Sequence, residues 1–533
     1  MLTGAVYKEL QNSLQCIRRY LYQKQSGLLI SYEQNQREIF NMKKIIIVGG
    51  GVSGISAGIY AKKAGFEVVI FEKNQLAGGQ CMGWNRKQHH IDNCIHWLTG
   101  TKKETSLWNI WNEVGAIEPD TEYVKSEKFF TTYVGNEQVT LWKNLDRTEQ
   151  ELLALSPADE TEIKKFITHV KYATCCEMPA DKPMDMMGIK DYLKMGKAMA
   201  DMPKVVKEYG KIDMQDLANR FKHPVIKTFL TDYLPKEYTA TSFIVSYATI
   251  ASGNGDVPVG GSLAMVNRML KKYQDLGGFL SCNSPVKKVC LEGNLATGIE
   301  LVDGNIHKAD YVLLATDAGE ALEKLLANKY TDKKWQKSFS DSRKYPLFSG
   351  VQMAFSIDKA TYPYSGTIFF DCKTVQVGDK NVNRMSVKSF EYETEWAPAG
   401  KIVLQANILQ YDEDYEYWKS LDEKTYTMIK KKLAEEVRER IVEKFPSLKG
   451  YIELLDCWTP MTYERYCNSY HGAYMGFITR KDVKPFRVKG TVKGIKNVYL
   501  ASQWIQSPGG LPVAVTAGKF TIQRILRKST VNG

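Results

Sequence analysis

The sequence lacks the cysteine and histidine patterns of metal sites and disulfide frameworks. Its ten cysteines are scattered over 533 residues without a Cys-x-x-Cys pair, and none of its seven histidines stands in metal-ligand spacing with a cysteine. Scattered free thiols in a long chain are typical of a reducing compartment. We therefore predict no metal, no disulfide framework and a cytoplasmic location.

Long apolar runs are also missing. No stretch reaches the ~18 uninterrupted apolar residues that a membrane-spanning helix needs, and residues 1–40 lack the basic start and apolar centre of a secretory signal. The net charge is 72 − 60 = +12, without compact Lys/Arg blocks that carry interleaved aromatic residues. This charge suits an anionic cofactor or a membrane surface, and nucleic acid is disfavoured. We predict a soluble protein, at most peripheral at a membrane.

The pattern along the chain predicts two or more interleaved domains. It reads as strand, turn, helix and strand over 42–115, mostly helix over 118–249, and helix then short strands over 254–335. Antiparallel strands are expected over 347–410, a helix over 425–445, and a strand, glycine turn and helix at the end. Residues 1–41 have the spacing of an amphipathic helix for a membrane or a partner. Because Met42-Lys43-Lys44 resembles a natural start, we expect this extension to be dispensable.

The stretch from Ile45 to Lys73 has the pattern of a nucleotide-binding turn. A short apolar strand is followed by Gly49, Gly51 and Gly54, in the spacing Gly-x-Gly-x-x-Gly, and then by a helix. Its helix start, with Val52 and Ser53, offers free N–H groups and a positive dipole end to a pyrophosphate. Glu72 ends the next strand 21 residues after Gly51, close to the ~20 expected for an acid that binds a ribose hydroxyl.

Further motifs decide which dinucleotide is expected. After Glu72 and Lys73 come a second glycine pair with Gln80 (Gly78, Gly79), then Cys81, Asp92 and His96. Farther along stand "PVGGS" from Pro258, "SPVKKV" with Val286, "TPMTYERYCNSYHGAYMG" and the closing "NVYLASQWIQSPGGLPVAVTAGK". Together they resemble FAD-dependent oxidoreductases of the phytoene desaturase and amine oxidase superfamily. The resemblance is closest to the retinol saturase and carotenoid isomerase branch.

The resemblance implies an α/β fold with a bipartite FAD-binding Rossmann-type domain and an inserted α+β substrate domain. The first would comprise 42–115, 254–335 and 480–533, and the second 116–253 and 336–479. FAD would be held by Gly49, Gly51, Val52, Ser53, Gly54, Glu72, Lys73, Gly78, Gly79, Gln80, Val286, Gly509, Gly510, Leu511 and Val513. Two positions depart from the family pattern: Gln80 replaces a phosphate-binding Arg, and Cys94 replaces a common glycine. Phosphate binding should therefore rely more on backbone and helix dipole.

The expected activity is saturation, desaturation or isomerisation of carbon–carbon double bonds in an apolar polyene, retinoid or isoprenoid-like substrate. One dinucleotide fingerprint is present, so either NAD(P)H visits the flavin transiently or electrons come from another protein, a quinone or the substrate. Tyr466, Tyr470 and His471 are candidate proton donors or orienters, and plain packing is the alternative for each. His96 is likewise either a site residue or a structural histidine.

The substrate region is expected in the helices of 118–250 and the strands of 347–410. Its methionines and aromatic residues are either core or the lining of an apolar tunnel: Met184, Met186, Met187, Met195, Met199, Met202, Tyr233, Tyr238, Phe243 and Tyr247. Cys81 and Cys94 are expected to be buried thiols.

Two other functions stay open on the sequence. An oxygen-using amine oxidase would use the tyrosines of 466–474 as an aromatic cage. A non-catalytic flavin-containing lipid-binding protein would attach to membranes through residues 1–41. The oligomeric state, the exact substrate and the direction of the redox reaction are not indicated by any pattern.

Overall fold

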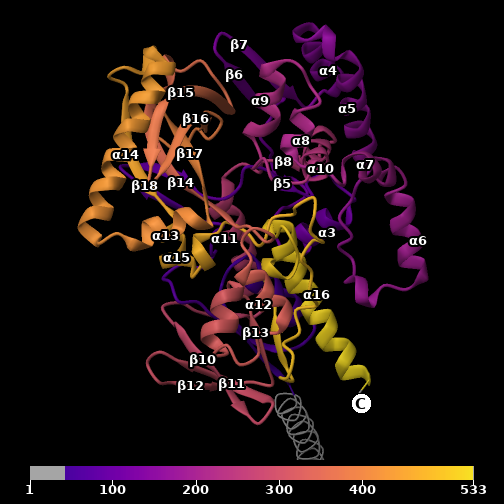
Figure 1. Cartoon of the computed structure of the whole chain (residues 1–533). Helices are drawn as coiled ribbons and strands as arrows, with labels where there is room; N and C mark the ends of the chain where they lie inside the picture. The colour runs from indigo at the N-terminus through magenta and orange to yellow at the C-terminus, as the bar shows by residue number, and fades with distance from the viewer. Residues whose placement is uncertain (1–41, 532–533) are drawn as a thin grey trace, which may run out of the picture.

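A computed structural model describes residues 42–531, which form two parts, each built around its own sheet (Figure 1). A parallel sheet with its helices forms one part of the molecule. A large, mostly antiparallel sheet flanked by helices forms the other. The amphipathic helix predicted within 1–41 lies outside the described residues. No helix between residues 42 and 531 is long and apolar enough to cross a membrane.

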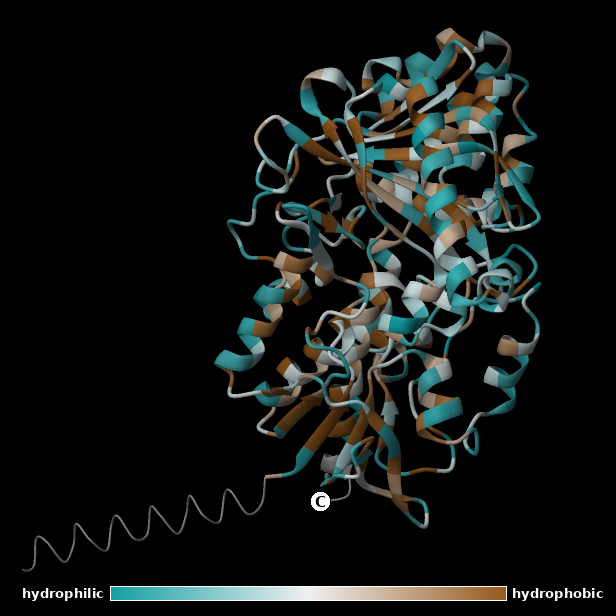
Figure 2. Ribbon diagram, turned by 90° about the vertical axis from the view of Figure 1, so that its left-hand side faces the viewer, coloured by the Kyte–Doolittle hydropathy of each residue, from teal (hydrophilic) through white to brown (hydrophobic). Residues whose placement is uncertain are grey.

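The parallel sheet has the strand order β19-β13-β1-β2-β9 and draws its strands from three separated stretches of chain. Its strands are β1 (Lys44–Val48), β2 (Glu67–Phe71), β9 (Phe279–Ser281), β13 (Tyr311–Leu314) and β19 (Val498–Leu500). All four pairings are parallel. Figure 2 shows the hydrophobic residues gathered in these strands. Such continuous apolar runs are typical of parallel strands that are covered on both faces.

Successive residues of β1 enter different cores, because strand side chains alternate between faces. Ile45 and Ile47 belong to the core formed with three helices, whereas Ile46 and Val48 belong to the core on the other face. The first face is covered by α2 (Val52–Lys63), α11 (Gly261–Asp275) and α16 (Gly510–Val531), with α3 (Ser106–Glu113) beside them. The second is covered by β10 (Val286–Glu292), β11 (Leu295–Leu301), β12 (Ile306–Lys308) and α12 (Lys333–Ser340).

The larger sheet has the order β18-β14-β17-β16-β15-β6-β7, and only its β15–β6 pairing is parallel. Its central strands include β14 (Phe348–Asp358), β15 (Thr367–Val377), β16 (Lys380–Ser389) and β17 (Lys401–Tyr411), and β18 (Ile452–Trp458) forms one edge. One face packs on α14 (Glu423–Lys444), with α13 (Asp412–Ser420) and α15 (Pro460–Cys467) at one end. The other face borders the interior of the molecule.

A group of helices completes this part of the molecule. It contains α4 (Leu145–Leu155), α5 (Glu160–Ala173), α7 (Met202–Tyr209), α8 (Met214–Ala218), α9 (Pro224–Asp232) and α10 (Ala240–Ala251), and α6 (Ile189–Ala198) stands apart at the edge (Figure 1). Two short antiparallel pairs, β3 (Gly83–Arg86) with β4 (His89–Asp92) and β5 (Leu98–Thr99) with β8 (Gly255–Asp256), link the two parts.

The prediction of mostly helix over 118–249 was wrong at its beginning. Residues 128–142 form the hairpin β6 (Lys128–Val134) and β7 (Glu137–Trp142). The alternating, β-branched and aromatic sequence "KFFTTYVGNEQVTLW" turns at Gly135, which has a φ of +56°. The hairpin continues the large sheet by pairing β6 with β15. The strands predicted over 347–410 and the helix predicted over 425–445 are confirmed.

Candidate functional site: a dinucleotide turn that opens into an inner cavity

The glycine turn after β1 is shaped by close backbone contacts. A Cβ on Gly49, whose φ is +103°, would lie 2.9 Å from the Ala315 carbonyl oxygen. A Cβ on Gly54 would lie 2.0 Å from the Gly49 oxygen. Gly51 is different, because its nearest neighbours would be 3.9 Å away from an added Cβ. The fold therefore requires Gly49 and Gly54, whereas Gly51 keeps open the space in front of the α2 N-terminus.

The second glycine pair lies directly against this turn. The Gly78 N–H donates to the Gly50 carbonyl at 2.8 Å, and Gly51 and Gly78 form an isolated parallel bridge. Gly78 and Gly79 have φ angles of +140° and +61°. The two glycine motifs, which the sequence presents as separate signals, thus form one continuous backbone surface with few side chains. Such a surface suits a pyrophosphate.

Glu72 is buried and ties the turn to the strand that follows. One carboxylate oxygen accepts the Gly50 N–H at 2.8 Å, and the other accepts the N–H and the side-chain amide of Asn74, both at 2.9 Å. Three of the roughly four lone-pair sites of the carboxylate are thereby used. One stays available for a ribose hydroxyl. The residue therefore shapes the turn in addition to the ribose role expected of it.

The closing glycine turn brings the C-terminal helix to the same place. Gly509 and Gly510 have φ angles of +93° and +81°, and α16 begins at Gly510. The Gly510 N–H donates to Gln503 Oε1 at 2.8 Å, and the Gln503 amide donates to the Tyr474 carbonyl at 3.3 Å. The positive end of the α16 dipole therefore borders the interior.

A single cavity of about 1830 Å³ connects these features. Its lining includes every predicted cofactor residue except Gly54, which packs inside the turn: Gly49, Gly51, Val52, Ser53, Glu72, Lys73, Gly78, Gly79, Gln80, Val286, Gly509, Gly510, Leu511 and Val513. Sites for one small ligand usually measure about 300–1,000 Å³. The volume, the open glycine surface and the two helix N-termini fit FAD together with a second molecule.

Two of the side chains predicted to bind the cofactor donate hydrogen bonds to other residues of the chain. The Gln80 amide donates to the Ser469 hydroxyl at 2.6 Å and to the Ala473 carbonyl at 2.8 Å. The Lys73 ammonium donates to the Arg465 carbonyl at 2.8 Å and also to the Asn468 side chain. Burial lowers the pKa of Lys73. These contacts fasten the region of the second glycine pair to the segment after α15.

Asp92 joins two of the sequence motifs. Its carboxylate accepts the Ser262 N–H at 2.6 Å and the Ser262 hydroxyl at 2.8 Å, at the start of α11. It also accepts the Cys94 N–H at 3.1 Å. The spacing from Asp92 to His96 therefore has a local cause, since Asp92 caps the α11 N-terminus and fixes the loop that carries His96.

The far end of the cavity has an aromatic wall. It is formed by Trp97, Phe129, Tyr233 and Phe369, with ring centroids 6.0 Å apart for Trp97–Phe129 and 4.5 Å apart for Phe129–Tyr233. Of the residues predicted as a tunnel, Tyr233 and Tyr238 line the cavity. Phe243 and Tyr247 lie in the helical core, and Met184, Met186, Met187, Met195, Met199 and Met202 are not in the lining.

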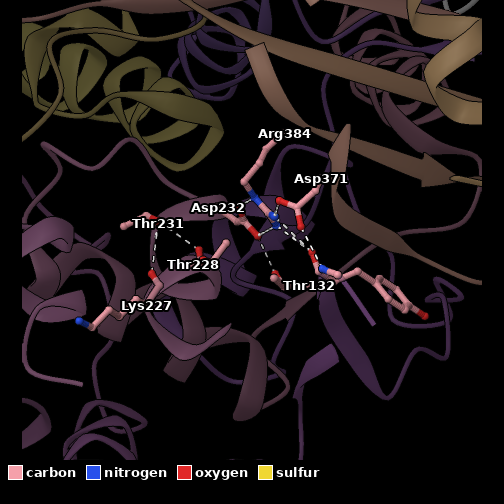
Figure 3. Close-up of polar contacts among 9 residues, drawn as sticks. Thr132, Lys227, Thr228, Thr231, Asp232, Asp371 and Arg384 are labelled. Atoms are coloured by element: carbon pink, nitrogen blue, oxygen red, sulfur yellow. Dashed lines mark hydrogen bonds and ion pairs between the residues drawn. The ribbon is translucent and has the colours of Figure 1, made fainter. Parts of the chain in front are cut away.

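An ion-pair network closes this end (Figure 3). The Arg384 guanidinium donates to both oxygens of Asp232, at 2.8 and 2.7 Å, and also contacts Asp371. Thr132 donates to Asp232 at 2.8 Å. Burial raises the pKa of Asp232, while Arg384 opposes the rise. The network connects α9 to strands β6, β15 and β16, and Asp232 and Arg384 line the cavity themselves.

A polar row crosses the sheet floor between the two ends. The Gln352 amide donates to the hydroxyls of Tyr474 at 2.8 Å and Tyr463 at 3.0 Å, and the Tyr474 hydroxyl donates to Asn407 at 3.3 Å. All four residues line the cavity. Sequence reasoning missed Gln352 and Asn407 and included Tyr474 only within the tyrosines of 466–474. The alternation of polar and apolar residues along β14 and β17 is the signal that could have found them.

Lys388 is a second residue that sequence reasoning missed. It follows Arg384 and Ser386 on one face of β16, and its ammonium donates to the Ile95 carbonyl at 3.3 Å. Burial lowers its pKa to about 8. His96 also lines the cavity, and its depth within the molecule, with Lys388 beside it, lowers its pKa to about 3. A neutral imidazole and an easily deprotonated amine therefore face the same space.

The three predicted catalytic residues do not share one site, because only Tyr466 lines the cavity. Tyr466 is on the cavity rim and 57% exposed. Tyr470 stacks on His471, with ring centroids 4.1 Å apart, and His471 is 3.0 Å from an oxygen of Asp412. Neither Tyr470 nor His471 lines the cavity, so both occupy packed positions outside its lining. Cys81 and Cys94 do line it, and hydrogen bonding to Cys94 together with burial raises the pKa of Cys81.

Comparisons with known proteins identify the family to which the chain belongs. The family model described as flavin containing amine oxidoreductase matches residues 52–526. The chain belongs to that family. It is a flavin-dependent oxidoreductase with the bipartite fold, and the open turn at Gly51 fits the flavin dinucleotide.

Individual relatives of the chain share little sequence with it. A zeta-carotene-forming phytoene desaturase from Myxococcus xanthus is 23% identical over 523 residues, covering 92% of this chain and 95% of the relative. A chloroplastic prolycopene isomerase from Daucus carota is 21% identical, covering 80% and 71%. A crystal structure of an oxidoreductase from Methanosarcina mazei has a TM-score of 0.58 at 16% identity, covering 90% of this chain and all of that one, which shows a shared fold.

Proposed function

We propose that this flavoenzyme acts on carbon–carbon double bonds of an apolar polyene, retinoid or isoprenoid-like substrate, by saturation, desaturation or isomerisation. The observation that carries the proposal is the continuous cavity, which runs from the dinucleotide turn to an aromatic wall in the large sheet. Its size leaves room for an extended apolar molecule beside FAD. The full-length similarity to a phytoene desaturase supports the same substrate class.

FAD is assigned to the end of the cavity formed by the glycine motifs. The backbone of Gly51, Gly78 and Gly79 would hold the pyrophosphate, and Glu72 would accept a ribose hydroxyl. The α16 N-terminus would lie at the flavin ring and favour negative charge there. When bound, the flavin supplies the hydride or electron transfer.

Proton handling is assigned to the polar row on the sheet floor. Tyr474 is connected to the closing glycine turn through Gln503, and its hydroxyl is held by Gln352 and Asn407. Burial raises the pKa of Tyr474, so the phenol stays protonated and able to donate. Tyr470 and His471, the candidates favoured by the sequence, would act only by positioning the segment that carries Tyr474.

The number of dinucleotide turns bears on the choice of electron donor. Because one such turn is present in residues 42–531, NAD(P)H would have to reach the flavin transiently through the cavity mouth. A substrate, quinone or protein donor needs no such visit. An apolar substrate of this kind is stored in lipid, so the enzyme would contact a bilayer peripherally.

Amine oxidation is the second candidate, because the matching family model is described by that activity. Tyr463 and Tyr474, with ring centroids 5.1 Å apart, would then form the aromatic cage. An amine oxidase would have its flavin reduced by amines and would release hydrogen peroxide in air.

One experiment separates the candidates. The FAD-loaded enzyme is incubated without oxygen with NADH, NADPH, a polyene panel in vesicles, and an amine panel. The proposal predicts a polyene product whose conjugated double bonds have changed in number or in cis/trans geometry, and no flavin reduction by amines. Bleaching by NADH or NADPH would assign saturation. Reduction by amines with unchanged polyenes would overturn the proposal.

A further inference from the structure

Helix α6 has no buried residue, although half of its ten residues are apolar. It forms the central part of an arm, residues 181–200, that stands at the edge of the molecule (Figure 1). Ile189 and Leu193 are 82% and 69% exposed, which makes them the most exposed large apolar side chains among residues 42–531. Tyr192 is also exposed beside them.

The faces of α6 carry different kinds of side chain. Met195 and Met199 turn partly toward the protein together with Asp191, at i, i+4 and i+8. Ile189, Leu193 and Gly196 lie on the next face, which is open to solvent. Lysines occupy the face beyond it: Lys190, Lys194 and Lys197. This order, apolar stripe beside basic stripe, is typical of helices that lie in a membrane interface.

The arm is fastened by polar contacts and by partly buried methionines such as Met199. The Arg524 guanidinium pairs with Asp185 at 2.6 Å, and the Gln523 amide donates to the Asp181 carbonyl at 2.9 Å. A helix of ten residues with an interior glycine is marginal in water by itself. A surface that covers its apolar stripe would supply the missing stabilisation.

The charge of the arm selects the kind of surface. Lys182 and Lys194 are paired with Asp191 and Asp181 at 3.1 and 3.5 Å. No carboxylate in the described part of the chain pairs with Lys190 or Lys197. The chain as a whole carries +12. An anionic surface complements both the lysine stripe and the whole molecule, and lysines near anionic lipid each contribute about 1 kcal/mol to binding.

The arm is also next to the cavity. Met184 contacts Arg487, whose guanidinium donates to Gln506 Oε1 at 2.7 Å, and Gln506 is part of the cavity lining. Met178, which precedes the arm, lines the cavity as well. A bilayer under α6 would therefore lie close to a cavity that suits apolar molecules.

We propose that the α6 arm docks the protein on an anionic lipid bilayer, with Ile189, Tyr192 and Leu193 inserted among the acyl chains and Lys190, Lys194 and Lys197 at the headgroups. Docking through α6 would bring the proposed polyene enzyme to a substrate dissolved in lipid. Only this purpose of the docking rests on the proposed function. The attachment itself is independent of turnover.

Vesicle cosedimentation of the full chain with bound FAD tests the arm. Phosphatidylcholine vesicles with and without phosphatidylglycerol are used at low salt and at about 0.5 M salt. We expect binding to the anionic vesicles only, lost at high salt. Ile189→Ser/Leu193→Ser should weaken it at least tenfold. Lys190→Gln/Lys197→Gln should weaken it about tenfold or more.

The matched control is Ile306→Ser/Met428→Ser, which removes two apolar side chains that are each 63% exposed elsewhere and do not line the cavity. It should bind vesicles as the wild type does. Equal binding by the Ile189/Leu193 variant would overturn the proposal. So would a wild-type protein that ignores vesicles and forms a dimer that this variant breaks, since a second copy would then cover α6. Flavin content and flavin reduction, measured without vesicles, report the enzyme proposal separately.

Discussion

At the residue scale, glycines that look alike in the sequence have different tasks. Gly49 and Gly54 prevent clashes within the protein, whereas an added Cβ at Gly51 would meet no atom of the chain closer than 3.9 Å. The first two are therefore needed for folding, and the third for the ligand. This difference makes cofactor binding testable without damage to the fold.

Gly51→Val should abolish flavin retention, because its side chain would occupy the path of the pyrophosphate. The free energy of unfolding of the apoprotein should change by only about 1 kcal/mol, the cost of a poorer helix N-cap. Flavin content after purification and urea unfolding measure the two effects. Gly54→Ala is the contrasting variant, since its Cβ would lie 2.0 Å from the Gly49 oxygen and should prevent folding. Full flavin content in Gly51→Val would refute the site.

Glu72→Gln should weaken FAD binding at least tenfold and lower stability by about 1–3 kcal/mol. Whichever oxygen becomes the amide, its N–H groups face the Gly50 N–H or the Asn74 donors. Fluorescence titration of the apoprotein with FAD and thermal unfolding check both effects. Asn74→Ala keeps the Glu72 carboxylate and should bind FAD within about threefold of the wild type. Unchanged FAD affinity in Glu72→Gln would contradict its role.

Lys388→Met should change how stability depends on pH. Burial lowers the pKa of Lys388 from 10.5 to about 8, so between these values the unfolded chain binds more protons than the folded one. Wild-type stability should therefore rise with pH from 8 to 10.5, relative to the Met variant, by at most about 3 kcal/mol. Below pH 8 the variant should be the more stable protein. Urea unfolding of both proteins at pH 7 to 10.5 gives the difference, and a constant difference would refute the buried ammonium.

At the scale of elements, the aromatic end of the cavity depends on the joint between α9 and the large sheet. Arg384 from β16 holds Asp232 at the end of α9, and Thr132 from β6 adds a third bond (Figure 3). The Asp232 side chain of this ion pair is only 5% exposed. Loss of one partner alone would leave a charge without compensation.

Arg384→Met should destabilise the protein by about 3–5 kcal/mol, because Asp232 would be buried without its partner. Arg384→Met/Asp232→Asn should recover most of that loss. Equilibrium unfolding of the two single variants and the double variant forms a double-mutant cycle. Additive effects of the two substitutions would show that the pair is not coupled and would contradict this account of the joint.

Local patterns predicted the elements around the nucleotide turn well. The apolar β1, the glycine spacing and the helix after "PVGGS" are fixed by neighbouring residues, so the sequence reveals them directly. The β6–β7 hairpin was missed because it lies among helices and its role is to extend a sheet whose other strands come more than 200 residues later. Its alternation was visible, but the surrounding helical pattern outweighed it.

At the scale of the whole molecule, the site is assembled from distant segments. The motifs around Gly49, Gly78 and Gly509 were recognisable singly, and the fold brings all three to one cavity. Gln352, Asn407 and Lys388 carry no motif, because their placement comes from the face of a strand within a seven-stranded sheet. Tyr470 and His471 stood in a suggestive block, yet the turn there directs His471 toward Asp412 and packs Tyr470 against Phe339, so neither reaches the cavity. Side-chain direction in a short irregular segment is not encoded by spacing.

The central claim is that one cavity holds FAD against an apolar polyene. Its most direct test is a single turnover without oxygen, in which FAD-loaded protein is mixed with a slight excess of polyene in vesicles, in the oxidised and in the reduced state of the flavin. The flavin band and the polyene band are followed together. The account predicts that in one of the two states the polyene spectrum shifts by about one equivalent per flavin, with an opposite change of the flavin band for redox chemistry or none for isomerisation. A protein that binds FAD one to one and leaves every polyene unchanged in both states would contradict it.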